Sequence, residues 1–207
     1  MGRVPTHPLW RPYELADLDD VAKARVSGRS RPVVVVPYDD GWPARYAEVA
    51  ARVRAALGDR VLRLDHVGST AVPGLAAKPV IDADLTVRDS ADEPSYLPAL
   101  EAAGFELRVR EPEWEEHRVV VTEGPMTNLH VWSPGSPEPL RTAAFRDWLR
   151  SHPDDRDAYG ALKVELAGRG FSEVMDYNNH KSAMVYDLYE RIFTADPAHQ
   201  HDPQPRA

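Results

Sequence analysis

The 207-residue sequence has no cysteine, no long apolar run and no excess of positive charge. Without cysteine, the chain can form neither a disulfide nor a thiolate metal site, which fits a reducing compartment. Its longest aliphatic run is the four valines at 33–36, too short to span a membrane, and no basic stretch followed by an apolar run opens the sequence. We therefore expect a cytoplasmic protein without a membrane partner. The net charge of −8 argues against bulk binding to nucleic-acid backbones.

Three common motifs for nucleotide and metal chemistry are also missing. The sequence contains no G-x-x-x-x-G-K-[ST] phosphate loop, no G-x-G-x-x-G and no H-E-x-x-H. Any phosphate or metal site must therefore be built from other residues.

The stretch at 61–87 contains the most informative pattern. Residues 61–67 and 80–87 read as two strands, with a Gly-Ser turn at Gly68 and Ser69 after the first. On the second strand Asp82 and Asp84 share one face, about 6.5–7 Å apart along the chain. Two such carboxylates suit Mg²⁺, while Gly68, Ser69 and Thr70 suit phosphate oxygens. Taken singly, each half is more often a plain turn or a solvated face.

The order of these elements resembles the signature of nucleotidyltransferases related to DNA polymerase beta. Residues 66–82, His-Val-Gly-Ser-Thr-Ala-Val-Pro-Gly-Leu-Ala-Ala-Lys-Pro-Val-Ile-Asp, resemble the hallmark of the GrpB family. Later stretches agree, at 128–131, 145–150, 159–163 and at Tyr177 with Lys181, so the resemblance covers residues 33–195. It implies a nucleotidyltransferase-type fold and superfamily chemistry without naming a substrate. Some relatives of this family are joined to a dephospho-CoA kinase, and this chain lacks the phosphate loop of that half.

The periodicity predicts an α/β (α+β) fold with a mixed or antiparallel-rich sheet flanked by helices. Strands are expected at 33–36, 61–67, 80–87, 105–109, 117–122 and 128–132, and helices at 14–26, 42–57 and 94–103. A C-terminal helical section follows at 140–151, 154–167 and 176–194. We expect a peripheral arm at 1–31, the domain at 32–195 and a disordered tail at 196–207.

Four cations are candidates for an anionic pocket. Lys78 lies between the two halves of the motif, where a triphosphate would pass. Lys181 interrupts an apolar helix face, so it either meets an anion or extends to solvent. Arg146 and Arg150 are one helical turn apart and either clamp a phosphate or remain surface charges.

His130 occupies the position where related transferases commonly place a third carboxylate. The later strands contain no obvious acid there, so we expect one Mg²⁺ rather than two, with His130 as a metal ligand, phosphate contact or proton acceptor. His66, Arg118, Arg150 and Tyr177 are expected around the pocket. For the two histidines, a structural hydrogen-bonding role is the alternative.

These observations predict a Mg²⁺-dependent transfer of a nucleoside monophosphate from an NTP to a small-molecule or protein acceptor. Asp82, Asp84 and His130 are the predicted catalytic residues. One alternative is a non-catalytic protein that binds a nucleotide or phosphometabolite on the same fold. Another is a protein-interaction module whose acids are merely solvated.

Overall fold

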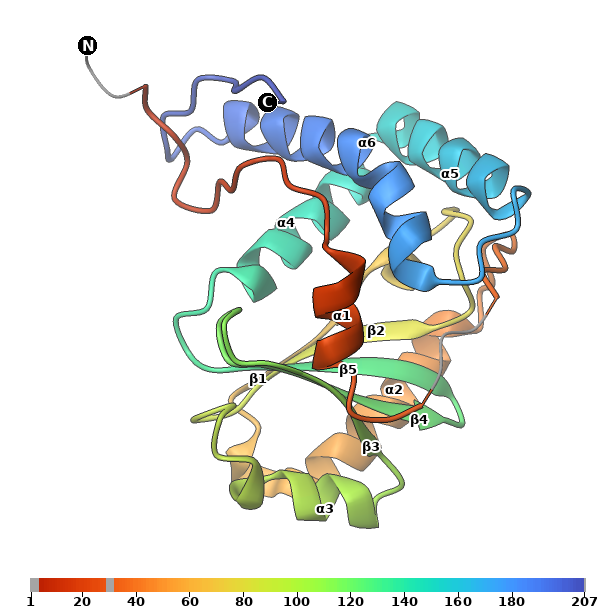
Figure 1. The fold of residues 1–207 in the computed structure, drawn as a ribbon, viewed down its shortest axis with the longest axis vertical. Helices are drawn as coiled ribbons and strands as arrows, with labels where there is room; N and C mark the ends of the chain where they lie inside the picture. The colour runs from red at the N-terminus through yellow and green to blue at the C-terminus, as the bar shows by residue number, and fades with distance from the viewer. Residues whose placement is uncertain (1–3, 29–31, 207) are drawn as a thin grey trace.

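The computed structural model describes residues 4–28 and 32–206, which form a five-stranded sheet with helices on both faces (Figure 1). The strands are β1 (Arg63–Val67), β2 (Ile81–Thr86), β3 (Glu106–Glu111), β4 (His117–Glu123) and β5 (Met126–Trp132). They lie in the order β1-β2-β5-β4-β3. β2 and β5 run parallel, and the other three neighbouring pairs are antiparallel. The predicted α/β class with a mixed sheet is confirmed.

One face of the sheet packs on α2 (Trp42–Leu57) and α3 (Leu97–Ala102). Pro43 lies in the first turn of α2, and Gly58, with φ of +58°, ends it, as the sequence predicts. The core here is a layer of buried apolar side chains from both elements: Val49, Val53, Leu57, Ala83, Leu85, Leu129 and Val131. Because side chains alternate along a strand, Asp82 and Asp84 point to the other face.

That other face is covered by α4 (Glu138–Ser151), α5 (Pro153–Ala167) and α6 (Val174–Ala195) (Figure 1). Their shared core includes two residues of the β1–β2 loop: Val72, Leu75, Leu149, Tyr159 and Leu188 are all buried in one cluster. The C-terminal helical section therefore packs directly on the loop that joins the two halves of the motif. Among the helices of the described residues, none is both long and apolar enough to cross a membrane.

The N-terminal segment, which contains α1 (Leu18–Ala24), runs beside α6 (Figure 1). Trp10 Nε1 donates to a Glu190 carboxylate oxygen over 2.7 Å. Residues 196–206 contain no helix or strand, yet His201 Nε2 lies 2.9 Å from the other Glu190 oxygen. Both chain ends thus contact α6. Residues 1–3, 29–31 and 207 of the predicted arm and tail lie outside the described residues.

The four valines at 33–36 predict a strand, and this prediction is wrong. Val36 forms an isolated bridge with Ala77, with two backbone hydrogen bonds of 2.9 Å. Val33 is buried instead against Leu166 and Tyr177 of the C-terminal helices. Val33 and Val35 thus pack on the C-terminal helices while Val34 is exposed, and no ladder of strand hydrogen bonds develops.

Candidate functional site

The site is built on the two aspartates of β2. Asn128 Nδ2 donates to Asp82 Oδ1 over 2.9 Å. Trp132 Nε1 donates to Asp84 Oδ1 over 2.9 Å, and the Thr142 hydroxyl of α4 donates to Asp84 Oδ2. Asp84 is only 2% exposed, whereas Asp82 is half-buried. The two carboxylates therefore differ: Asp84 is fixed inside the fold, and Asp82 has an oxygen free toward the Gly-Ser turn.

The Gly-Ser turn lies against Asp82. Gly68 has φ of +66°, and a Cβ at this position would be 2.6 Å from Asp82 Oδ2. Glycine is needed here both for its backbone conformation and for the close approach of the carboxylate. Ser69 begins a short 3₁₀ turn at residues 69–71, and its Oγ accepts a 2.9 Å hydrogen bond from Lys163 Nζ of α5.

Two further lysines from separate elements lie near Lys163, and we call Lys78, Lys163 and Lys181 the lysine cluster. The chain has four lysines in total. The Lys163 and Lys181 ammonium groups lie 4.7 and 5.9 Å from the centre of the Tyr159 ring. Those of Lys78 and Lys181 lie 5.7 and 5.9 Å from the Tyr177 ring. Within the described residues, no carboxylate lies within ion-pair distance of any of the three.

Burial lowers the pKa of all three amines of the lysine cluster. Lys163 is 3% exposed, and burial, with Lys181 and Lys78 nearby, lowers its pKa to about 6. Burial lowers the pKa of Lys181 to about 8 and also lowers that of Lys78. Asp82 opposes all three shifts. A bound anion would therefore satisfy these groups better than one half-buried aspartate does.

Lys163 was not predicted as a site residue, although the signal was present. It lies four residues after Tyr159 and three before Leu166, so it interrupts the apolar face of its helix as Lys181 does. Tyr177, which was predicted, is buried at the cluster, and its hydroxyl has no hydrogen-bond partner among the described residues. An unpaired buried hydroxyl is a second group that a ligand could satisfy.

Arg146 and Arg150 donate hydrogen bonds to backbone carbonyls of the motif. Arg146 Nη1 donates to the His66 carbonyl over 2.8 Å, and its other nitrogens pair with Asp147. Arg150 Nε and Nη2 donate to the Ala71 carbonyl over 2.9 and 2.7 Å. These carbonyls flank the Gly-Ser turn, so the predicted phosphate clamp is, in this structure, a brace between α4 and the turn.

His66 and Thr70 face away from the aspartates. His66 pairs in register with Ala83, on the α2 face of the sheet, and stacks on Tyr46 with ring centroids 4.5 Å apart. Its Nε2 lies 3.0 Å from the Thr70 hydroxyl. Burial lowers the pKa of His66 to about 4. The two side chains thus contact each other, His66 also contacts Tyr46 of α2, and they have a structural role beside the turn.

Arg118 is not brought to the site either. It pairs in register with Val131, on the α3 face, and donates to Glu93 over 2.7 Å and to Glu116 over 3.2 Å. Its alternation with apolar neighbours reflects a buried ion pair on the far side of the sheet.

His130 lies on the same face as the aspartates, because its register partner on β2 is Asp84. Its Nδ1 lies 3.0 Å from His117 Nε2. No third carboxylate joins Asp82 and Asp84: among the described residues, the group of three potential metal ligands with atoms within 4.8 Å of one another is His7, Asp196 and His199.

That group belongs to the two terminal segments and not to the site at Asp82 and Asp84. The Leu9 N–H donates to His7 Nδ1 over 3.0 Å, so the ring proton is on Nε2, which lies 2.9 Å from Asp196 Oδ2. A protonated Nε2 has no lone pair for a metal. We therefore interpret these contacts as structural hydrogen bonds that join the N-terminal segment to residues 196–206.

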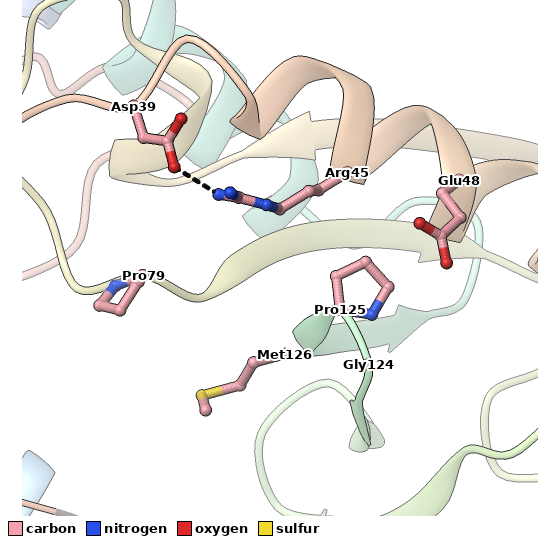
Figure 2. Close-up of a pocket in the computed structure, with 7 residues that line it drawn as sticks. All are labelled: Asp39, Arg45, Glu48, Pro79, Gly124, Pro125 and Met126. Carbon is pink, nitrogen blue, oxygen red and sulfur yellow. Dashed lines mark hydrogen bonds and ion pairs between the residues drawn. The ribbon is translucent and has the colours of Figure 1, made fainter.

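A separate hollow of about 560 Å³ lies between the start of α2, the loop before β2 and the β4–β5 turn (Figure 2). Its charged lining is largely neutralised, since Asp39 and Arg45 form an ion pair of 2.7 Å. The lining residues are Asp39, Arg45, Glu48, Pro79, Gly124, Pro125 and Met126, which include neither aspartate of β2 and no lysine.

The fold and site define an α/β protein with a cluster of three lysines near two strand aspartates. A family model described as GrpB protein matches residues 32–191, and the chain belongs to the GrpB family. A UPF0157 protein of Halalkalibacterium halodurans is 44% identical over 177 residues, covering 84% of this chain and 90% of the relative. The crystal structure of GrpB from Enterococcus faecalis matches with a TM-score of 0.68 and 28% identity, covering 78% of this chain and 98% of that one.

A further relative, from Mycolicibacterium paratuberculosis, is named dephospho-CoA kinase. It is 33% identical over an alignment of 188 positions, which covers 78% of this chain but 46% of the relative. The shared region is therefore about half of that protein.

Proposed function

We propose that this protein is a nucleotidyltransferase that moves a nucleoside monophosphate from an NTP to a hydroxyl, phosphate or amine acceptor. The observation that carries the proposal is the gathering of three lysines near Asp82, one of which, Lys163, donates to Ser69. A polyphosphate supplies the negative charge that three lysines with one nearby aspartate lack. The motif's resemblance to polymerase-beta-like transferases supplies the reaction class.

The donor set at β2 fits one magnesium ion. Asp82 and Asp84 offer hard carboxylate oxygens, and each oxygen that accepts a hydrogen bond keeps a second lone pair. When bound, the ion would neutralise phosphate charge and polarise the reacting phosphoryl group. No third carboxylate accompanies them in the described residues, which supports one ion rather than two.

The chain's own groups would then bind and orient the nucleotide. Ser69 and the backbone of the Gly-Ser turn would bind phosphate oxygens, and Lys78, Lys163 and Lys181 would balance their charge. Charge-assisted hydrogen bonds of this kind are about twice as strong as neutral ones. Arg146 and Arg150 would act indirectly, by keeping the turn in place.

The second candidate is a non-catalytic protein that binds a nucleotide or phosphometabolite. It is favoured by the missing third acid and by the state of Asp84, which is buried and accepts a hydrogen bond on each oxygen. Binding at the lysine cluster needs neither a second ion nor an acceptor.

The test is incubation of the protein with each NTP, Mg²⁺ and a cell metabolite extract. Pyrophosphate release and new nucleotidylated masses are expected from the wild type but not from an Asp82→Asn, Asp84→Asn variant. Mg²⁺-dependent NTP binding without turnover would favour the second candidate. Absence of both binding and turnover would contradict the two candidates together.

A further inference from the structure

Three side chains on neighbouring strands form a hydrogen-bonded row that ends at the site. Glu111 closes β3, His117 opens β4 and His130 lies in the middle of β5. Glu111 Oε2 is 2.6 Å from His117 Nδ1, and His117 Nε2 is 3.0 Å from His130 Nδ1. His117 is 2% exposed, so water cannot readily substitute for these partners.

The row determines which nitrogen of each ring carries a proton. A carboxylate only accepts, so the Glu111 side fixes a proton on His117 Nδ1. Burial lowers the pKa of His117 to about 4, so the ring is neutral and its Nε2 is an acceptor. His130 Nδ1 must then be the donor. This hydrogen bond selects the His130 tautomer whose Nε2 is unprotonated, and that Nε2 has no hydrogen-bond partner among the described residues.

Aromatic packing holds the row in place. The His117 ring stacks on Trp132 with centroids 4.1 Å apart, and it also makes a T-shaped contact with Trp114 at 4.9 Å. The His117 and His130 rings are within 9° of parallel, with centroids 5.1 Å apart, as the hydrogen bond between their edges requires. Trp132 also donates to Asp84, so the same indole orients both the row and the predicted metal-binding strand.

We propose that Glu111 and His117 are positioning residues that hold His130 with its Nε2 free to accept the proton of the acceptor substrate. The inference rests on the proposed function and narrows the acceptor to a hydroxyl or amine, which loses a proton as it attacks. The acceptor oxygen or nitrogen bonds to the α-phosphorus, the bond from that phosphorus to the bridging oxygen breaks, and pyrophosphate leaves. The acceptor's proton goes to His130 Nε2.

The ring nitrogens can be observed without any turnover. In ¹⁵N-labelled protein without ligand, His130 should show a protonated Nδ1 and an unprotonated Nε2 of the pyridine type. His117→Phe keeps the stacking ring but removes both nitrogens, so the Nε2-protonated form of His130 should become dominant. Glu111→Leu is the second variant and should give a mixture of tautomers. His180→Phe, at an exposed histidine of α6, is the control and should change nothing at His130.

Kinetics then test the consequence. With an acceptor found by the metabolite screen, His130→Ala should lower kcat about 100-fold or more. His117→Phe should lower kcat about 10- to 100-fold with KM for the NTP unchanged. A protonated Nε2 in the wild type, or an unchanged tautomer in His117→Phe, would overturn the positioning role. An unchanged kcat in an active His117→Phe protein would overturn the link to catalysis. The expected tautomers in a protein without any turnover would count against the proposed function alone.

Discussion

Lys163 of α5 donates a 2.9 Å hydrogen bond to Ser69 of the Gly-Ser turn, across 94 positions of sequence. The bond joins the C-terminal helices to the motif that the first half of the domain builds. It also brings a nearly fully buried amine within reach of two other lysines. A buried ammonium without an acidic partner destabilises the ligand-free protein, but it can form an ion pair with a bound anion.

We expect Lys163→Met to stabilise the ligand-free protein. The folded-state pKa of about 6 lies below the unfolded value near 10.5, so Lys163 lowers the free energy of unfolding most below pH 6, and this penalty fades as pH rises toward 10.5. Methionine removes it and should add about 1–2 kcal/mol at pH 6. Denaturant unfolding from pH 6 to 9 checks this, because the gain should shrink with rising pH. A variant less stable than wild type at pH 6 would contradict it.

Anion binding should take up protons. In the free protein Lys163 and Lys181 lose their protons above pH values of about 6 and 8, and a bound anion raises both pKa values. Sulfate keeps its charge over this range, so its affinity should fall as pH rises from 6 to 9. Calorimetry in buffers of different ionisation enthalpy measures the uptake, and Lys163→Met should reduce it. An affinity independent of pH would show that these amines do not meet the anion.

Gly68→Ala should cause backbone strain and should also disturb the Asp82 carboxylate. The new Cβ would lie 2.6 Å from Asp82 Oδ2 and displace the carboxylate. Gly135→Ala is a matched control, since Gly135 also has a positive φ, +90°, but nothing within 4 Å of the added atom. Both should lose about 1–3 kcal/mol of stability from strain, and Gly68→Ala alone should lose Mg²⁺-dependent NTP binding. Equal binding by the two variants would refute the close approach.

Features of the site that depend on strand or helix periodicity could be predicted from the sequence. Contacts between residues far apart in the sequence could not. Strand alternation was enough to place Asp82 and Asp84 on one face, and the apolar stripe of α6 was enough to single out Lys181. The same alternation put His66 on the opposite face, which the motif alone did not reveal. Arg146 and Arg150 were correctly one turn apart, but their partners are backbone carbonyls that periodicity cannot locate. The valines at 33–36 had strand propensity without a strand to pair with.

The lysine cluster is the proposed site of a polyphosphate, and calorimetric titration with inorganic tripolyphosphate and Mg²⁺ tests this role without knowledge of the base. Lys181→Met keeps much of the side-chain volume and removes the charge, while Lys23→Met makes the same change at an ion-paired lysine whose side chain is 75% exposed. We predict equal binding by wild type and Lys23→Met, and binding weaker by about 1.5–3 kcal/mol for Lys181→Met. Equal affinity in all three proteins, or no binding by the wild type, would contradict the account.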